Sequence, residues 1–247
     1  MKEFSESLLK QIISQIDRCL ETLDRPAVAA FDADGTLWNM DMSEHFVQYQ
    51  EREKLLTEIP HSPWQHHLKM HKEDPKAAYL WLAQINAGHP ISEVRGWADR
   101  FLKDYGAIPT FTSQRQIIDH LRKKEVEIYI ITASVKWAVE PGARLYGVDE
   151  DHVIGVATQV KEGLVTTEQD GEITWREGKV KGLLNKTNGV YPFFAAGNSS
   201  GDLPLIESAT DIHLVVSAAQ PGEHTYETEQ EMLKIAEERE WYRHRFN

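Results

Sequence analysis

The sequence predicts an α/β protein with a Rossmann-like, doubly wound parallel sheet core and a small all-helical cap domain. Two observations predict the core: short apolar runs alternate with amphipathic segments, and several of these runs end in polar side chains. A third observation predicts the cap, because residues 39–105 contain helical patterns without a convincing strand. We therefore expect the core to comprise residues 1–38 and 106–247, and the cap to comprise residues 39–105.

The composition is that of an ordinary globular protein that carries a net negative charge. Hydrophobic residues make up 41% of the chain and charged residues 27%, and the net charge is -12. This charge argues against a general binder of nucleic acid or anionic membranes. No apolar run approaches a membrane span or the core of a signal peptide. We expect a cytoplasmic protein with a small substrate, and its oligomeric state stays open.

The first part of the chain predicts a helix, a strand and then the helical stretch. Apolar residues recur at helical spacing over residues 4–23, and Pro26 follows. Residues 27–31 form an apolar run that is too short for a typical helix and is consistent with a buried strand. Within the stretch that follows, helices are predicted over residues 42–56, 64–70, 75–85 and 91–105.

The second part of the chain returns to regular alternation. It begins with a helix over residues 111–124, a strand over 126–132 and a helix over 135–146 that Pro141 and Gly142 interrupt. A strand over residues 153–157 leads into a hairpin-like excursion over 159–175. The remaining elements are a helix over 179–186, a strand over 191–196, a helix over 202–208, a strand over 212–217 and a closing helix over 227–241.

Two carboxylates follow the first strand. Asp32 and Asp34 are two residues apart, so in extended chain they share a face, and Gly35 follows where the chain must turn. Two neighbouring anions repel each other unless a cation or a shared proton lies between them, and hard oxygen ligands favour Mg²⁺. A simple acidic hairpin turn is the alternative, but the next segment lacks the pattern of a partner strand.

Polar groups also follow two later strands. Thr132, Ala133 and Ser134 end the second strand, and the turn over 197–202 places Asn198 and Asp202 after another. Sites in open α/β sheets form at the carboxyl ends of strands, so these groups are expected to meet there. Lys179 adds a cation at the start of a helix. The Ser134 hydroxyl has two alternative roles, which are binding phosphate and capping the following helix.

In this order the motifs resemble those of the haloacid dehalogenase (HAD) superfamily, specifically its phosphoserine-phosphatase-like branch. The resemblance implies that Asp32 is a nucleophile, that Asp34 is an acid/base and that Lys179 steadies charge on the nucleophile and the phosphoryl oxygens. It implies phosphate binding by Thr132, Ala133, Ser134, Lys179 and Gly35, and Mg²⁺ binding by Asp32, Asp34, Asn198 and Asp202. Asn198 departs from the family pattern, in which an Asp usually stands, and its amide oxygen brings no negative charge to Mg²⁺.

The resemblance further implies a Mg²⁺-dependent phosphatase that hydrolyses a small phosphomonoester through an aspartyl-phosphate. Asp34 favours an ester over a carbon–halogen substrate, because an alkoxide leaving group needs a proton and a halide does not. Two alternatives stay open. One is transfer of the phosphoryl group to an acceptor other than water. The other is a non-catalytic module with a weakened metal site that binds a phosphorylated ligand or a partner.

The cap is expected to select the substrate, which the sequence does not identify. Its large aromatic residues are expected to be mostly core, and a cage for a quaternary ammonium is the alternative; these residues are Trp38, Trp64, Trp81 and Trp97. Three polar residues early in the cap are expected to face solvent, with contact to a substrate head group as the alternative; they are Glu44, His45 and Arg52.

Overall fold

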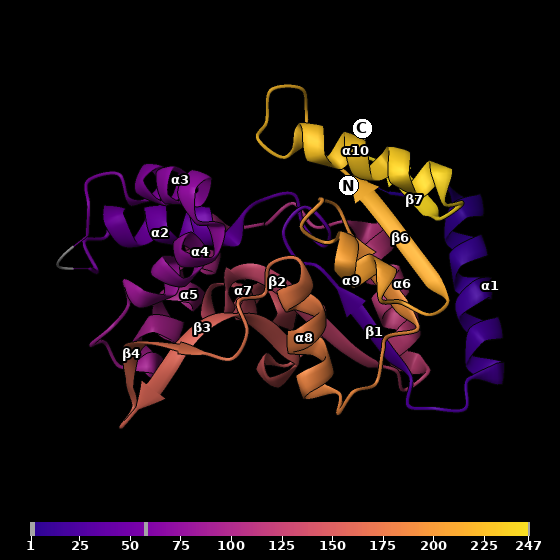
Figure 1. Cartoon of the computed structure of the whole chain (residues 1–247), viewed down its shortest axis with the longest axis horizontal. Helices are drawn as coiled ribbons and strands as arrows, with labels where there is room; N and C mark the ends of the chain where they lie inside the picture. Colours follow the sequence, from indigo (N-terminus) through magenta and orange to yellow (C-terminus); the bar gives the residue numbers. More distant parts are fainter. Residues whose placement is uncertain (1–2, 57–58, 247) are drawn as a thin grey trace.

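The computed structural model describes residues 3–56 and 59–246, and in them a seven-stranded sheet has the order β4-β3-β2-β1-β5-β6-β7 (Figure 1). Every neighbouring pair is parallel except β3 and β4, which form an antiparallel hairpin. The predicted α/β fold is therefore confirmed. The strands are β1 (Val28–Phe31), β2 (Glu127–Val135), β3 (Val153–Lys161), β4 (Leu164–Asp170), β5 (Phe194–Gly197), β6 (Ile212–Ser217) and β7 (Tyr242–Arg245).

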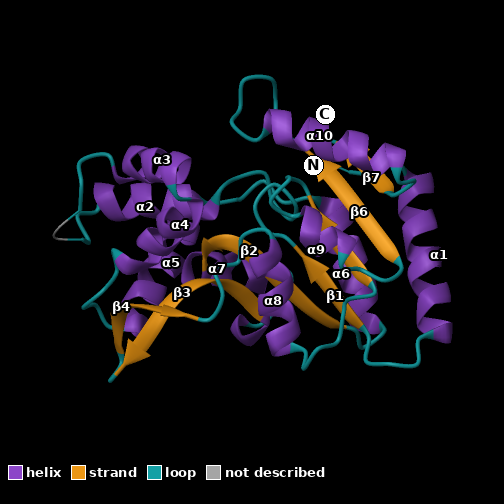
Figure 2. Ribbon diagram, viewed as in Figure 1, coloured by secondary structure: helices purple, strands orange, loops and turns teal. Residues whose placement is uncertain are grey.

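Helices cover both faces of the sheet, as the doubly wound prediction requires (Figure 2). Alternate side chains of β1 point to opposite faces, so Ala29 and Phe31 join one core cluster while Val28 and Ala30 join the other. The first face packs against α1 (Glu6–Thr22), α6 (Thr112–Lys123) and α7 (Lys136–Leu145). The second face packs against α8 (Glu177–Lys186) and α9 (Leu203–Glu207), and α10 (Tyr226–Glu238) packs on β6.

Four helices, which we call the helical insertion, lie between β1 and α6 in the chain. They are α2 (Met42–Arg52), α3 (Pro63–Glu73), α4 (Pro75–Gln84) and α5 (Ile91–Tyr105), on the left of Figure 1. Buried side chains of the insertion, such as Trp97, belong to the same apolar cluster as the first face of the sheet. Backbone hydrogen bonds also join the chain after α4 to the hairpin: Gly88 N–H donates to Val165 O at 2.8 Å, and Val165 N–H donates to His89 O at 2.9 Å.

The interruption predicted at Pro141 and Gly142 is wrong, since α7 runs through both residues. Proline removes one backbone hydrogen bond from a helix interior, and packing of the helix face offsets that loss here. Gly142 makes the packing possible, because a Cβ at this position would lie 2.9 Å from atoms of both Met42 and Trp38. Gly142, which looks like a helix breaker in the sequence, therefore provides the surface on which Trp38 packs.

The closing helix predicted over residues 227–241 is also wrong at its end. Helix α10 stops at Glu238, Glu240 has a positive φ of 57°, and the chain then adds β7 to the sheet. The Tyr-Arg-His-Arg sequence of β7 lacks an apolar run because an edge strand is only partly buried. Within the described residues, no helix is long and apolar enough to cross a membrane.

An ion pair with a buried carboxylate ties the insertion to the core. Arg95 of α5 donates to both carboxylate oxygens of Glu140 on α7, at 2.8 and 2.9 Å, and the Glu140 side chain is 1% exposed. The same two helices carry an exposed pair, Arg144 with Asp99. Since a carboxylate that is buried without its partner is costly, the first pair anchors the insertion more strongly than the second.

We predict that Arg95→Gln lowers the free energy of unfolding by about 1–3 kcal/mol, because it leaves the Glu140 carboxylate buried without its cation. Chemical denaturation measures the change. The matched control is Arg144→Gln, whose exposed pair contributes about 0–1 kcal/mol. Equal losses in the two variants would contradict the anchoring role of Glu140.

Candidate active site

The predicted site residues meet at the carboxyl ends of β1, β2 and β5. These three strands are adjacent and parallel, so their polar ends lie together. A cavity of ≈ 570 Å³ opens there toward the helical insertion. Every residue predicted for the site lines this cavity: Asp32, Asp34, Gly35, Thr132, Ala133, Ser134, Lys179, Asn198 and Asp202.

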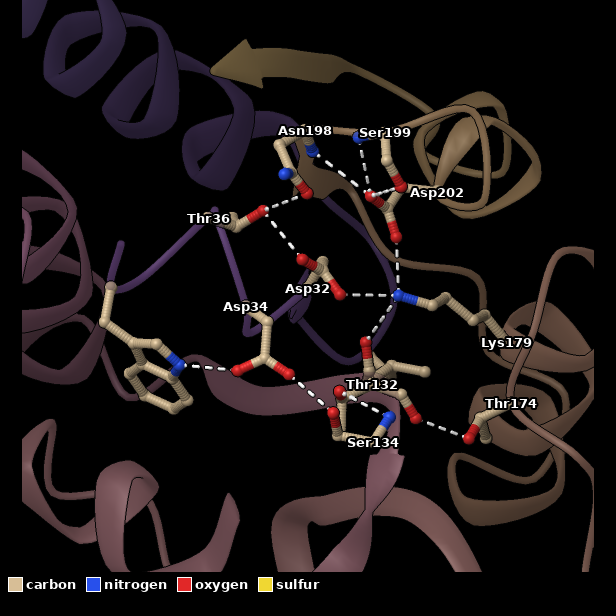
Figure 3. Close-up of polar contacts among 12 residues, drawn as sticks. Asp32, Asp34, Thr36, Thr132, Ser134, Thr174, Lys179, Asn198, Ser199 and Asp202 are labelled. Atoms are coloured by element: carbon tan, nitrogen blue, oxygen red, sulfur yellow. Dashed lines mark hydrogen bonds and ion pairs between the residues drawn. The ribbon is translucent and has the colours of Figure 1, made fainter. Parts of the chain in front are cut away.

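Lys179 is the central cation of the site. It comes from the first turn of α8, and its Nζ lies 2.6 Å from Asp32 Oδ1 and 2.5 Å from Asp202 Oδ1 (Figure 3). It also donates to Ile131 O at 3.0 Å. Burial alone lowers the pKa of Lys179, but the charges of Asp202 and Asp32 together raise it, so the amine stays protonated. Burial and the charge of Asp202 raise the pKa of Asp32 to about 7 against the influence of Lys179.

The turn after β5 wraps around the Asp202 carboxylate. Asp202 Oδ2 accepts hydrogen bonds from Asn198 N–H at 3.2 Å and from both the N–H and the hydroxyl of Ser199 at 2.9 Å. Gly197 allows this close wrapping, because a Cβ there would lie 2.5 Å from the Asp202 Cβ. Both oxygens of Asp202 thus serve to hold the turn and Lys179 in place.

Asp34 occupies a separate environment. Its Oδ1 accepts from the Trp38 indole at 2.7 Å and from Met42 N–H at 3.1 Å, and its Oδ2 accepts from the Ser134 hydroxyl at 2.6 Å. Burial, then the charge of Asp41, raises the pKa of Asp34 to about 7, and these hydrogen bonds limit the rise. The Ser134 hydroxyl is therefore bonded to Asp34 and does not cap α7.

The second motif lies in an irregular part of β2. The register of β2 against β3 shifts between Ile131 and Val135, so the strand bulges where it meets the cavity. In the bulge, Ser134 N–H donates to Thr132 Oγ1 at 3.0 Å, and the Thr174 hydroxyl donates to Thr132 O. Because Thr132 Oγ1 already accepts a hydrogen bond, its own proton is available to a ligand in the cavity.

The donor atoms fit a hard divalent cation. Thr36 Oγ1 lies 2.8 Å from Asp32 Oδ2 and 3.3 Å from Asn198 Oδ1, so one hydroxyl proton is shared by two acceptor oxygens that face the same point. Among the described residues that line the cavity, Lys179 is the one lysine or arginine, against several Asp and Glu residues. Asp32, Asp34, Asn198 and Asp202 stay the residues predicted to hold the metal. The three carboxylates also bond to the groups described above.

Other parts of the cavity lining combine acids and aromatic rings. They include Asp41 and Glu44 at the start of α2, and Tyr79, Tyr105 and Trp175. Glu44 and His45 are partly exposed and line the cavity, so contact with a substrate head group stays a prediction, whereas Arg52 is exposed and lies over the Tyr49 ring outside the cavity. The aromatic lining does not come from the predicted tryptophan set: Trp38, Trp64 and Trp97 are buried core residues.

Three functional candidates were missed by the sequence analysis. Asp41 follows the acidic motif closely, and its N-cap pattern before α2 was a usable signal. Trp175 lies in the segment between β4 and α8, and only the fold brings it to the cavity. Glu229 comes from α10, and it hydrogen-bonds to Asn198 across 31 positions of sequence, which no local pattern reveals.

The fold and the site define an α/β protein with paired aspartates, a buried lysine and an Asn/Asp turn at three strand ends. Residues 29–207 match the haloacid dehalogenase-like hydrolase family, and the chain belongs to that family. The phosphorylcholine phosphatase of Pseudomonas aeruginosa is 24% identical over 214 residues, which cover 69% of this chain and 60% of that protein. This chain therefore corresponds to about 60% of the length of that relative.

Solved structures share the fold. A protein of unknown function from Bordetella pertussis Tohama I has a TM-score of 0.68 at 21% identity, with 89% of this chain and 98% of that chain covered. A functionally unknown protein from Anaerococcus prevotii has a TM-score of 0.72 at 14% identity, with 98% and 94% covered. A substrate-bound phosphoserine phosphatase has a TM-score of 0.53 at 16% identity, with 86% and 99% covered. The predicted membership of the HAD superfamily is confirmed.

We predict that Lys179→Met lowers the free energy of unfolding by about 3–5 kcal/mol, because it leaves Asp32 and Asp202 buried without a cation. Chemical denaturation at neutral pH measures the change. Lys181→Met is the matched control, since Lys181 lies on the same helix and is exposed. If Lys179→Met were as stable as the control, Lys179 would not be the charge that balances this site.

Proposed function

We propose that this protein is a Mg²⁺-dependent phosphomonoesterase in which Asp32 forms an aspartyl-phosphate. One observation carries the proposal: two aspartates only two residues apart stand in different environments. Asp32 is paired with Lys179 and faces the centre of the site, whereas Asp34 is bonded to Ser134 and Trp38. The cation beside Asp32 favours its ionised form, whereas Trp38 and Ser134 offer Asp34 only neutral donors, and two carboxylates in such different surroundings can divide two chemical roles.

Asp32 is the nucleophile because its carboxylate lies between Lys179 and Thr36, at the point where a phosphoryl group would be bound. Its oxygen attacks phosphorus, the bond from phosphorus to the alcohol oxygen breaks, and protonated Asp34 gives that oxygen its proton. Asp34 then takes a proton from water, which attacks the aspartyl-phosphate, releases phosphate and regenerates Asp32.

The phosphoryl oxygens are bound by Lys179 and by the Thr132 hydroxyl, whose proton is available. A Mg²⁺ ion held by Asp32 and Asn198 would supply further positive charge at the phosphoryl group. Residues 39–105 act as the cap that selects the alcohol, because they contribute Asp41, Glu44 and Tyr79 to the lining of the cavity.

We predict that Asp32→Asn abolishes phosphate release from every phosphomonoester, because the amide is not a nucleophile for phosphorus. Asp34→Asn should reduce turnover of alkyl esters by about 10²–10⁴-fold, the contribution of a general acid. For a nitrophenyl ester, the first step in Asp34→Asn, followed as the burst of nitrophenolate, should lose much less, because nitrophenolate leaves without a proton. Hydrolysis of the aspartyl-phosphate should slow for every ester, because Asp34 is also the base of that step.

Phosphate release with and without MgCl₂ is the measurement. Full activity of Asp32→Asn, or equal losses in the step that releases the alkyl alcohol and the nitrophenolate in Asp34→Asn, would contradict these roles. Binding of a phosphomonoester by the unsubstituted protein without any release of phosphate would favour a binding module. Turnover of the ester only when an alcohol acceptor is added would favour a phosphotransferase.

The head group of the substrate is proposed to be cationic. Asp41 and Glu44 add negative charge to the cavity lining, and Tyr79, Tyr105 and Trp175 add aromatic rings of the kind that attract an ammonium group. A substrate carboxylate, as in phosphoserine, would meet these acids, and Lys179, which the proposal assigns to the phosphoryl group, is the one lysine or arginine among the described lining residues. The relative named phosphorylcholine phosphatase has a substrate of the favoured kind.

We predict that kcat/KM is higher for phosphocholine and phosphoethanolamine than for phosphoserine, and that Asp41→Asn lowers it for phosphocholine by about 10–100-fold. That range corresponds to a charge-assisted contact of about 1.5–3 kcal/mol. Asparagine keeps the hydrogen bond that caps α2, at 2.9 Å from Glu44 N–H, so the fold should be unaffected.

Glycerol phosphate is the matched control for Asp41→Asn, since its neutral alcohol makes no charge contact. An equal loss for glycerol phosphate and phosphocholine would mean that Asp41 supports the structure of the site and does not contact the cationic head group. A preference for phosphoserine would overturn the cationic assignment.

A further inference from the structure

Asn198 has an amide with two faces that meet different partners. Its Oδ1 faces Thr36 and the acceptor point shared with Asp32, and its Nδ2 donates to Glu229 Oε1 at 2.9 Å. The side chain is buried, with 3% of the residue exposed. A carboxylate only accepts hydrogen bonds, so the amide NH₂ of Asn198 must point toward Glu229 and the amide oxygen must point toward Thr36.

Glu229 is itself held in one position. It belongs to the first turn of α10 and is 2% exposed. Its Oε2 accepts from the backbone N–H groups of Ala218 at 2.8 Å and Ala219 at 2.9 Å, in the chain that follows β6. All of these partners donate, which matches the acceptor-only chemistry of a carboxylate. The two backbone donors fix the carboxylate, and the carboxylate fixes the amide.

We propose that Glu229 is a positioning residue that turns the Asn198 amide oxygen toward the metal. Its carboxylate, hydrogen-bonded to Asn198 on the side away from the metal, also supplies the negative charge that an aspartate at position 198 would carry. The inference rests on the Mg²⁺ site of the proposed function. Hydrogen-bond partners behind metal ligands commonly orient them and increase their affinity for the metal. Here the partner also accounts for the departure from the family motif.

The pair must be exchanged as a unit. An aspartate at position 198 would place its carboxylate at hydrogen-bond distance from the carboxylate of Glu229, with no proton between them. Like charges in a buried contact repel each other strongly. Restoring the usual aspartate alone therefore should not improve the metal site, although it adds a charged ligand.

The single substitution Glu229→Gln tests the orientation. The backbone N–H groups of Ala218 and Ala219 bind the glutamine oxygen, which leaves the glutamine NH₂ facing Asn198. Asn198 then rotates its amide so that its oxygen accepts from the glutamine and its NH₂ faces the metal. Since NH₂ does not bind Mg²⁺, we expect the affinity for Mg²⁺ to fall by about 10–100-fold.

The double variant Asn198→Asp with Glu229→Gln tests the pairing. The glutamine NH₂ donates to one oxygen of the new aspartate, and the other oxygen faces the metal. We expect the double variant to regain the wild-type affinity for Mg²⁺, whereas Asn198→Asp alone binds no more tightly than wild type. A role of Glu229 in packing alone would not be rescued by a second substitution.

The full chain is titrated with MgCl₂, and binding is measured by calorimetry and by the rise in thermal unfolding temperature, neither of which needs substrate. Glu227→Gln is the matched control, because Glu227 is exposed on the same helix and should leave the affinity unchanged. Phosphate release is measured in parallel to separate the two proposals.

Weaker binding in Glu229→Gln that the double variant restores supports the inference. Unchanged affinity in Glu229→Gln, tighter binding in Asn198→Asp alone, or a double variant as weak as Glu229→Gln overturns it while the phosphatase proposal stands. Phosphate release by a wild-type protein that binds no Mg²⁺ overturns the inference together with the metal part of the proposed function.

Discussion

The ion pair of Lys179 with Asp32 and Asp202 is the interaction on which the site depends. Parallel strands bring their carboxyl ends together, so this sheet necessarily gathers acids from several motifs in one buried place. One buried lysine holds two of them, each within 2.6 Å. Several acids remain around the cavity, so its lining carries more acidic than basic side chains.

Close backbone approach turns this charge into a defined geometry. Gly35 has a φ of 81°, and a Cβ there would lie 2.1 Å from Nδ2 of Asn198, so the turn after β1 packs directly against the turn after β5. Thr36, next in the chain, then reaches both Asp32 and Asn198 with one hydroxyl. The glycine matters for the site because it sets the distance between two strands' polar ends, which side chains alone would not fix.

The sequence predicted the α/β fold and the residues at the strand ends because both follow from short-range patterns. An apolar run followed by Asp32 and Asp34 is readable without knowledge of the fold, and so is the turn that holds Asn198. Long-range placement was not readable. Glu229 reaches Asn198 only because α10 packs on β6, and β7 pairs at the sheet edge without an apolar pattern of its own. The predicted helix interruption at Pro141 was wrong because packing of Gly142 on Trp38 outweighed the tendency of proline to break a helix.

The cavity lining combines one lysine with several acids, and the proposed function divides these groups between two parts of the substrate. Lys179 and the available Thr132 proton lie at the strand ends, where the proposal places the phosphoryl group. Asp41 caps α2 and Glu44 lies in its first turn, and Ser43 fixes this helix to β2 through a hydrogen bond from Val135 N–H at 2.9 Å. Acids beside the alcohol part of the substrate would attract a cationic head group and repel an anionic one. In this proposal Asp32 meets phosphorus and Asp34 meets the alcohol oxygen.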